Sequence, residues 1–342
     1  MPRRVLITGI TGFAGSHLAE RLVASGVAVQ GLALDGAGHP NLARVANEVR
    51  VHHGDITSSD DVRAAMREAR PDVVVHLAGQ AVPTLAAQDP VGAVRVNVLG
   101  TATVLNAVEE TNASLIFASS AEVYGSPERR IINEDAPLRP ENPYAATKVA
   151  AEALAHELGD RVGGRRTVVI LRATNQIGPR QHPGLAASAF AKQIAEAEAG
   201  AGAPGQGAPG RVATRGATAV VRHGALDARR DFLDVRDMAE AYKRAADIDR
   251  PGAHVFNVGT GHAVSIGEIL TALIELARVE VRTEVDPARV RSGAAPHFAL
   301  DAKRFREATG WEPKIELKES LRDLLDYWRE QVSANAGRHA PV

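Results

Sequence analysis

The sequence contains no cysteine, which excludes disulfide bonds, thiolate metal ligands and thiol nucleophiles. Aromatic residues make up only 4% of it, whereas alanine and glycine are plentiful, so helices can pack closely. The net charge is -1 and no basic, aromatic-rich stretch occurs, so we expect no nucleic-acid partner. The sequence also lacks a signal-peptide pattern and any uninterrupted apolar run long enough to cross a bilayer. We therefore expect a soluble, cytoplasmic protein with no membrane partner.

The chain has 342 residues, of which 45% are apolar, enough for a sizeable core in one large or two intertwined domains. Short apolar runs alternate with segments of helical periodicity as far as about residue 173. This alternation predicts the strands and helices of a doubly wound sheet. His52 and His53 are neighbours on a predicted strand and would point to opposite faces, so we predict no metal site there or elsewhere.

Three glycines follow the first predicted strand. Residues 4–8 form a short apolar run, Gly9, Gly12 and Gly15 come next, and helical periodicity begins at Ser16. A strand, a glycine turn and a helix in this order predict a dinucleotide-binding loop. Gly9 allows a tight turn, Gly12 allows close approach of a pyrophosphate, and Gly15 allows the helix to pack against the strand.

Carboxylates follow the second and third predicted strands. Asp35 comes after residues 28–34 and can accept hydrogen bonds from an adenosine ribose, although it can equally be a loop carboxylate. No arginine follows before Arg44 to meet a 2′-phosphate, which favours NAD(H) over NADP(H). Asp55 ends the third strand in a position to touch adenine.

A tyrosine and a lysine stand four residues apart in a predicted helix. Asn142 and Pro143 are typical of a helix start, so Tyr144 and Lys148 would lie on one helical face. An ammonium ~5 Å from a phenol, at an effective dielectric of ~20, favours the phenolate by ~3 kcal/mol. We therefore predict that Lys148 lowers the Tyr144 pKa toward the range for proton transfer. Taken alone, such a pair is more often two residues of a helix surface.

Other polar residues lie near the predicted strand ends. Ser120 ends the strand over residues 115–120, where it is either a turn residue or a hydroxyl that holds a substrate oxygen. Glu122 is either a second proton-transfer group or a surface carboxylate, and Asn97 can be a buried hydrogen bonder between helix and sheet. Residues 229–237 are charge-dense and precede an amphipathic helix, which indicates either a solvated face or an anion-binding cluster.

Six motifs together are more specific than any one of them. They are Thr8-Gly9-x-x-Gly12-x-x-Gly15, Asp55-Ile56, His76-Leu-Ala-Gly79, Asn97, Ser119-Ser120-x-Glu122-x-Tyr124-Gly125 and Tyr144-x-x-x-Lys148. Over nearly its whole length the chain resembles an extended short-chain dehydrogenase/reductase of the NAD-dependent epimerase/dehydratase family. The resemblance implies an α/β fold: a Rossmann-type doubly wound parallel sheet with a smaller α/β C-terminal substrate domain. The NAD(P)-binding domain would comprise residues 1–174 with contributions from about 224–258, the sugar-nucleotide domain 175–223 and 259–335, and a tail 336–342.

The resemblance also implies roles for individual residues. Those implied to be catalytic are Ser120, Glu122, Tyr144 and Lys148. Those implied to bind the cofactor are Gly9, Thr11, Gly12, Phe13, Ala14, Gly15, Asp35, Asp55, Ile56, Leu77, Ala78, Gly79, Asn97, Ser119, Tyr144 and Lys148. Those implied to bind the substrate are Asn175, Arg180, Lys192, Arg230 and Arg291. The family commonly forms homodimers through two helices per subunit, here those near Asn97 and Tyr144.

The second half of the chain indicates a branch of the family. Its motifs are Asn175-x-Ile-Gly-Pro-x-Gln181, Phe190-Ala-Lys-Gln-Ile194 and Arg230-Asp-Phe-x-Asp-Val-Arg-Asp237. They look like those of reductases that act on GDP-linked 4-keto-6-deoxy sugars. The implied reaction is NAD(P)H-dependent reduction of GDP-4-keto-6-deoxy-D-mannose to GDP-D-rhamnose. The alternatives are a GDP-mannose 4,6-dehydratase, another nucleotide-sugar epimerase or dehydratase, or a non-catalytic dinucleotide sensor.

Overall fold

A computed structural model of the protein describes residues 3–34, 38–161, 166–202, 218–289 and 297–338. Asp35, predicted to bind the cofactor, and Arg291, predicted to bind the substrate, lie outside the described residues. Both therefore stay predictions from sequence.

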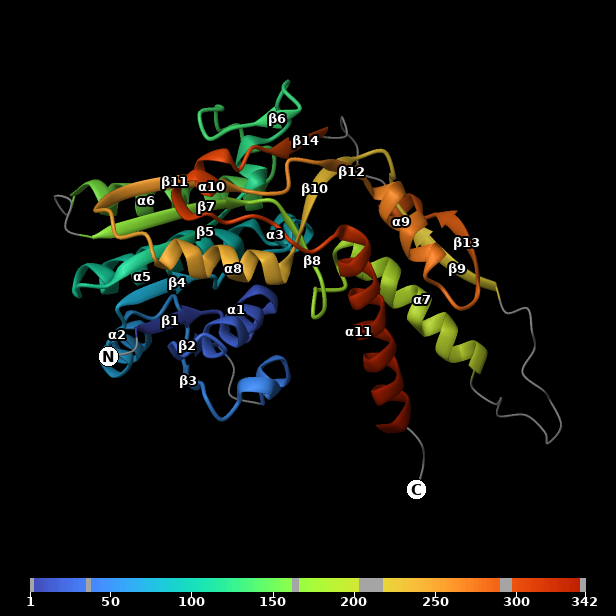
Figure 1. Ribbon diagram of the computed structural model, residues 1–342, viewed down its shortest axis with the longest axis horizontal. Helices are drawn as coiled ribbons and strands as arrows, with labels where there is room; N and C mark the ends of the chain where they lie inside the picture. Colours follow the sequence, from blue (N-terminus) through green and yellow to red (C-terminus); the bar gives the residue numbers. More distant parts are fainter. Residues whose placement is uncertain (1–2, 35–37, 162–165, 203–217, 290–296, 339–342) are drawn as a thin grey trace.

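The larger sheet has seven strands, all parallel, in the order β11-β7-β5-β4-β1-β2-β3 (Figure 1). Its strands are β1 (Arg4–Thr8), β2 (Ala28–Ala33), β3 (Arg50–His53), β4 (Val73–His76), β5 (Ser114–Ser120), β7 (Thr167–Ala173) and β11 (Gly252–Val258). The chain winds outward from β1 in one direction and from β4 in the other. The crevice for a ligand in such a sheet opens where this winding reverses, at the carboxyl ends of β1 and β4. The predicted doubly wound α/β fold is confirmed.

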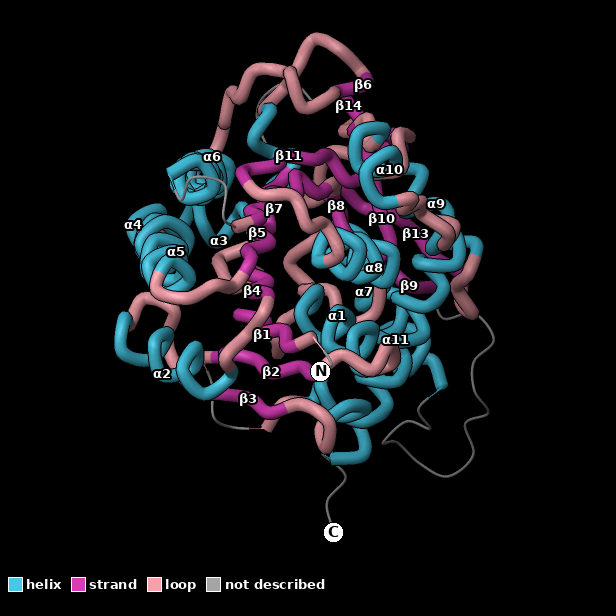
Figure 2. Tube along the Cα trace, turned by 60° about the vertical axis from the view of Figure 1, so that its left-hand side comes forward, coloured by secondary structure: helices cyan, strands magenta, loops and turns pink. Residues whose placement is uncertain are grey.

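Helices cover both faces of this sheet (Figure 2). On one face, α1 (Phe13–Val23) and α8 (Val235–Ala246) share a core with Val5 and Ile7 of β1. On the other, α2 (Ser59–Ala69), α5 (Thr101–Glu109) and α6 (Pro143–Arg161) share a core with Leu6. Because both faces are covered, the strands are nearly continuous apolar runs rather than alternating ones.

A long helical stretch precedes α5. It contains α4 (Pro90–Val94) and η2 (Arg95–Gly100), a π-helical segment, and follows the short α3 (Pro83–Gln88). Within the described part of the chain, Pro90–Glu109 is the one helix long and apolar enough by composition to cross a membrane, with a mean hydropathy of 1.4. Arg95 and Asn97 interrupt its apolar run, and 44% of its most apolar 18-residue window is buried, so we assign it as a helix that packs one side against the protein core.

The C-terminal part has a separate core formed by α7 (Ala186–Gly202), α9 (Ile266–Glu275) and α11 (Leu317–Arg338). A smaller sheet of β12 (Ala263–Ser265), β10 (Arg229–Asp234), β14 (His297–Leu300) and β6 (Ile131–Ile132) lies beside it, with β8 (Asn175–Ile177) also paired to β10 (Figure 1). Strands β9 (Thr218–His223) and β13 (Glu280–Val285) pair with each other. The remaining short elements are η1 (Pro40–Val45), η3 (Ala121–Tyr124), η4 (Pro287–Arg289) and α10 (Lys303–Thr309). The bounds proposed for two domains stay a prediction.

Candidate active site

The loop between β1 and α1 has the geometry that its glycines predict. Gly9 has a φ of +73°, and a Cβ there would lie 2.9 Å from the Ala78 backbone. A Cβ on Gly15 would lie 2.2 Å from the Gly9 carbonyl oxygen, so only glycine allows α1 to pack this closely. Gly12 is the exposed N-cap of α1 and provides no side-chain cap. The open helix N-terminus and this close-packed loop fit the pyrophosphate of a dinucleotide.

The loop after β4 connects the glycine loop to Lys148. Ala78 packs against Gly9 on one side. On the other side, a Cβ on Gly79 would lie 2.8 Å from Asn97 Oδ1 and 4.0 Å from Lys148 Nζ. The predicted lysine therefore stands at the edge of the glycine-lined crevice.

Tyr144, Lys148 and Ser120 come together where β5 ends and α6 begins. Tyr144 lies in the first turn of α6 and is 8% exposed. The Lys148 ammonium donates to the Ala118 carbonyl at 2.8 Å and lies 6.0 Å from the centre of the Tyr144 ring. The Ser120 side chain hydrogen-bonds the Tyr144 phenol. The structure thus unites three of the four residues predicted to be catalytic, while Glu122 stands next along the chain on η3.

The prediction that Lys148 lowers the Tyr144 pKa was wrong. Burial raises the pKa of the Tyr144 phenol above its ordinary 10.0, the Glu122 charge raises it further, and the Ser120 hydrogen bond offsets only part of this. Burial also lowers the Lys148 pKa from 10.5 to about 8. The sequence argument counted one neighbouring charge and omitted the cost of desolvating the phenolate. A phenol that stays protonated is suited to donating a proton to an oxygen that gains negative charge.

Asn97 joins the loop after β4 to α6. Its Nδ2 donates to the Gln80 carbonyl at 3.1 Å and to Thr147 Oγ1 at 2.9 Å, and its Oδ1 accepts from the Gln80 N–H at 2.7 Å. The side chain is 2% exposed and lies in the π-helical segment η2. From sequence we considered that Asn97 could be a buried residue that hydrogen-bonds between helix and sheet. Asn97 is indeed buried and hydrogen-bonded, but its partners lie in a loop and a helix. A direct contact with the cofactor stays a prediction.

A buried chain of hydrogen bonds around His76 was missed from sequence. Thr8 Oγ1 accepts from the Ala78 N–H at 3.2 Å and lies 2.7 Å from His76 Nδ1. His76 Nε2 lies 3.0 Å from Thr101 Oγ1, which donates to the Asn97 carbonyl at 2.6 Å. Because the Thr101 hydrogen is already used, Nε2 carries the imidazole proton and Nδ1 accepts from Thr8. Burial lowers the His76 pKa from 6.5 to about 3, so the ring stays neutral. The available signal was a histidine within a buried strand.

The Ser119 hydroxyl is already hydrogen-bonded within the protein. Its hydroxyl donates to Glu152 at 2.6 Å and the residue is 6% exposed. Glu152 in turn pairs with Arg172, whose guanidinium also donates to the Tyr124 hydroxyl at 2.8 Å. The Ser119 hydroxyl therefore already has a hydrogen-bond partner. A contact between Ser119 and the cofactor stays a prediction, and it concerns the Ser119 main chain alone.

The other residues predicted to bind the cofactor surround the glycine loop or follow β3. The Thr11 carbonyl accepts from Asn41 Nδ2 at 2.9 Å, and Phe13 and Ala14 form the first turn of α1. Asp55 Oδ1 accepts from the Thr57 N–H at 2.8 Å. Ile56 is buried, and the Leu77 N–H donates to the Thr8 carbonyl at 3.2 Å. Their positions frame the crevice, and their contacts with a cofactor stay predictions.

Asn175 and Arg230 lie close together on paired strands of the smaller sheet. Asn175 Nδ2 donates to the Asp231 carbonyl at 3.3 Å, since β8 runs beside β10. The Arg230 guanidinium lies 6.0 Å from the centre of the Phe298 ring. The structure therefore brings these two predicted substrate residues to one region.

Arg180 and Lys192 have other partners. The Arg180 guanidinium donates to Ser16 Oγ at 3.0 Å and pairs with Glu20, both on α1, so it meets the cofactor-side helix. Lys192 on α7 lies 5.5 Å from the centre of the Trp328 ring. These contacts do not favour the substrate role predicted for either side chain, and the role stays untested.

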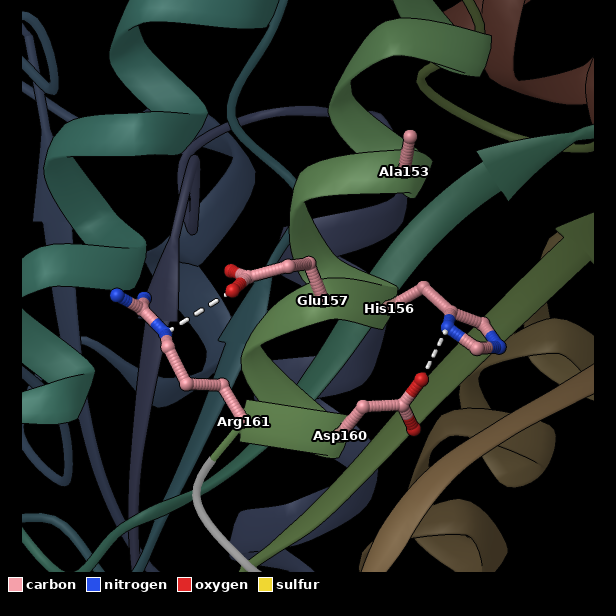
Figure 3. A pocket seen from close by; sticks show the side chains of 5 residues that line it. All are labelled: Ala153, His156, Glu157, Asp160 and Arg161. Atoms are coloured by element: carbon pink, nitrogen blue, oxygen red, sulfur yellow. Dashed lines mark ion pairs between the residues drawn. The ribbon is translucent and has the colours of Figure 1, made fainter.

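A surface hollow of about 580 Å³ lies along the exposed side of α6, toward the end of the helix opposite Tyr144. Figure 3 shows this hollow. Its lining residues are Ala153, His156, Glu157, Asp160 and Arg161. The charged ones pair along the helix, His156 with Asp160 at 3.2 Å and Glu157 with Arg161 at 3.1 Å. The charged side chains of this hollow pair with one another and form no arrangement suited to catalysis, so we place the active site at Tyr144.

Comparison with known proteins agrees with this geometry. A family model described as GDP-mannose 4,6 dehydratase matches residues 6–324. The chain is 33% identical to GDP-6-deoxy-D-mannose reductase of Pseudomonas aeruginosa, over 97% of this chain and 99% of that protein. Its structure is similar to RMD from Pseudomonas aeruginosa complexed with NADPH, with a TM-score of 0.78, 30% identity and 96% and 99% of the two chains covered. It is also similar to a Thermus thermophilus UDP-glucose 4-epimerase complex with NAD, with a TM-score of 0.78, 32% identity and 95% and 99% covered.

The fold and the site define an enzyme of the extended short-chain dehydrogenase/reductase class, as the sequence motifs predicted. Within that class the chain belongs to the GDP-mannose 4,6-dehydratase family. Its relatives include reductases and epimerases, so family membership gives the type of chemistry and leaves the particular reaction to be proposed.

Proposed function

We propose that this enzyme reduces the C4 ketone of a nucleotide-diphospho-4-keto-6-deoxy sugar, converting GDP-4-keto-6-deoxy-D-mannose to GDP-D-rhamnose. The observation that carries the proposal is the buried Tyr144 phenol, which lies beside Ser120 and Lys148 where β5 ends and α6 begins. Ketone reduction needs a proton donor at that position. The full-length similarity to a GDP-6-deoxy-D-mannose reductase supports the choice of sugar nucleotide.

Each residue has a distinct task in this reaction. A bound nicotinamide dinucleotide supplies the hydride for C4. Tyr144 donates its proton to O4, and Ser120 hydrogen-bonds the same oxygen as negative charge develops on it. The Lys148 ammonium, fixed by the Ala118 carbonyl, provides positive charge at the edge of the crevice. The buried position of the site strengthens these interactions because little water screens them.

The cofactor in this proposal is NADH or NADPH. The absence of arginine between Leu34 and Arg44 favours NADH, while the structural relative with NADPH supports the phosphorylated form. Titrating each reduced cofactor into the purified protein and following nicotinamide fluorescence would give the two dissociation constants. An NADPH dissociation constant below that of NADH would overturn the preference for NADH.

The test of the reaction is a mixture of enzyme, GDP-4-keto-6-deoxy-D-mannose and NADH or NADPH. We expect loss of the reduced-nicotinamide absorbance in one-to-one proportion to a product that co-migrates with GDP-D-rhamnose. Tyr144→Phe should lose on the order of 10²–10⁴-fold in kcat while it still binds the cofactor. A Tyr144→Phe enzyme with unchanged turnover would refute the proposed proton donor.

A dehydratase is the second candidate, because Glu122 is close enough for its charge to raise the Tyr144 pKa. In that reaction Glu122 would remove the C5 proton. However, its Oε2 accepts from Asn142 Nδ2 at 2.8 Å, which ties the carboxylate to the start of α6. Turnover of GDP-mannose without added cofactor would favour the dehydratase over the reductase.

We also propose that the enzyme is a homodimer that pairs through the long helix before α5 and through α6. Val91, Val94 and Leu99 on the first helix are 79%, 47% and 58% exposed, and Leu154 on α6 is 38% exposed. Apolar side chains along two neighbouring helices suit pairing with a second copy. Light scattering should give twice the mass of the chain, and Leu99→Glu should shift it toward the monomer. A wild-type monomer at micromolar concentration would refute the proposal.

A further inference from the structure

Two consecutive arginines of β10 lie on opposite faces of the smaller sheet. Successive side chains of a strand alternate between faces, and neighbouring strands align residues of the same face. Arg230 is registered with Phe298, which belongs to the apolar cluster shared with η3. Arg229 is registered with His297 on the other face. The sheet therefore separates Arg230, predicted to bind the sugar nucleotide, from Arg229.

The face that carries Arg229 is hollowed into a groove of about 440 Å³. We call this the outer groove; its lining residues are Arg130, Ile131, Arg229, Gly261, His262, Ala263, His297 and Ala299. They come from β6 and the residue before it, from β14 and β10, and from β12 and the turn that leads into it. The volume lies within the range of small-molecule sites in proteins.

A buried carboxylate holds one wall of the outer groove in place. Asp231, which is 1% exposed, accepts from the N–H groups of Thr260 and Gly261 at 3.1 Å and of Leu300 at 3.2 Å. These bonds fix the turn that carries Gly261 and His262 against β14. The groove is thus lined by strands and by an anchored turn.

Positive charge gathers in the outer groove. Arg229 is oriented by an ion pair with Glu268 at 2.8 Å, which neutralises one charge. Arg130 makes no ion pair with any residue that the structure describes. Desolvation and the charges of Arg130 and Arg229 lower the His297 pKa, so the three side chains lie near one another in the groove. His262 also lines the groove. A bound anion would meet two guanidinium groups and an imidazole here.

We propose that the outer groove binds an organic phosphate of nucleotide size, separately from the catalytic site. Arg130, Arg229 and His297 would hold the phosphate, since guanidinium groups fork onto phosphate oxygens. Ile131 and Ala299, registered side by side, provide an apolar surface for the rest of the ligand. The proposal concerns binding alone and holds whichever reaction the enzyme performs.

The experiment is calorimetric titration of GDP into an Arg230→Ala enzyme, in which the predicted sugar-nucleotide side is weakened. We expect one remaining site in this background. Adding Arg130→Ala and His297→Ala should weaken that site at least tenfold. The matched control adds Arg129→Ala and His156→Ala instead, an arginine and a histidine that are exposed and lie outside the groove lining, and it should leave GDP affinity unchanged.

Three results would overturn the proposal, provided that thermal unfolding shows each variant to be folded. They are no GDP binding in the Arg230→Ala background, unchanged binding after Arg130 and His297 are replaced, and equal weakening by the control with Arg129→Ala and His156→Ala. The reductase proposal fails by a different measurement, the loss of turnover with the 4-keto sugar nucleotide. Failure of one proposal is therefore distinguishable from failure of the other.

Discussion

Asn142 links Glu122 to the first turn of α6. Its Nδ2 donates to Glu122 Oε2 at 2.8 Å, and its Oδ1 accepts from the Ala145 N–H at 2.9 Å. One amide therefore fixes the carboxylate on one side and caps the helix that carries Tyr144 on the other. Glu122 acts on Tyr144 in two ways, through this cap and through the charge that raises the phenol pKa.

Glu122→Gln separates these two effects. The amide oxygen of glutamine can still accept from Asn142, while the negative charge is lost. Removing the charge stabilises the phenolate, so the Tyr144 pKa falls. When the ionisation of the phenol is followed by its ultraviolet absorbance, it should move to lower pH by on the order of one unit, with activity near pH 7 largely retained.

The matched control for this change is Glu141→Gln. Glu141 binds the Ser126 hydroxyl at 2.7 Å and precedes the cap residue, so its replacement tests a nearby charge without the link to Asn142. It should leave the ionisation of the phenol unchanged. Complete loss of activity in Glu122→Gln would instead identify Glu122 as a proton-transfer group and favour the dehydratase.

Lys148 should make stability depend on pH in the alkaline range. Its pKa is about 8 in the folded protein, against 10.5 for the ordinary side chain. Between these values the unfolded chain binds more protons than the folded one, so the free energy of unfolding rises with pH. The slope is at most about 1.4 kcal/mol per pH unit.

Urea unfolding of wild type and Lys148→Met at several pH values measures this effect. The difference between the two proteins should change across that window and stay constant below it. Lys192→Met, at a half-exposed lysine of α7, is the control and should run parallel to wild type. Parallel curves for Lys148→Met would show that the ammonium is not desolvated.

The glycine turn and the cap of α6 could be predicted because each depends on residues next to one another. Asn142 caps its helix as its residue type predicts, and Gly9 takes the positive φ that its turn requires. The direction of the Tyr144 pKa shift could not be predicted in this way. It depends on burial, to which Ala86 and Ala93 contribute by packing with the ring from α3 and α4.

The resemblance implied a smaller α/β domain, but most strands of its sheet were not located in the sequence, for a related reason. Ile131 pairs with Ala299 in strands of two and four residues, which are too short to have a period and are distant in sequence. Arg180 shows the same limit for the site. Sequence motifs associate it with the substrate, whereas its guanidinium lies on Ser16 and Glu20, more than a hundred residues away in the chain.

Arg180 should contribute to stability more than to substrate binding. It has a φ of +72°, a region that costs a non-glycine residue on the order of 1 kcal/mol. Arg180→Ala loses the contacts with α1 and keeps the strain, so it should unfold about 1–3 kcal/mol more easily. Arg180→Gly loses the same contacts but relieves the strain, and should be about 1 kcal/mol more stable than Arg180→Ala.

Urea midpoints of the two variants and their KM for the sugar nucleotide give the comparison. Because neither variant changes a group that faces Asn175 or Arg230 in the structure, both should keep a KM close to that of wild type. A large rise in KM with unchanged stability would instead support the substrate-binding role that the sequence predicted for Arg180.

His76 should remain a neutral ring with the proton on Nε2. The hydrogen bonds from Thr8 to Nδ1 and from Nε2 to Thr101 specify this tautomer, and burial lowers the His76 pKa from 6.5 to about 3. Nitrogen-15 NMR of the imidazoles at pH 5 to 7 should show one ring that does not titrate and whose Nε2 is protonated. Replacing His76 by glutamine should remove that signal, while His156→Gln, on the exposed side of α6, should remove a different one.

The neutral His76 should also make stability depend on pH. Between pH 6.5 and 3 the unfolded chain binds the extra proton, so wild type should lose stability relative to His76→Gln as the pH falls, by at most about 1.4 kcal/mol per unit. A titrating His76 would show that burial does not keep the ring neutral, and a proton on Nδ1 would show that His76 donates to Thr8 Oγ1 instead of accepting from it.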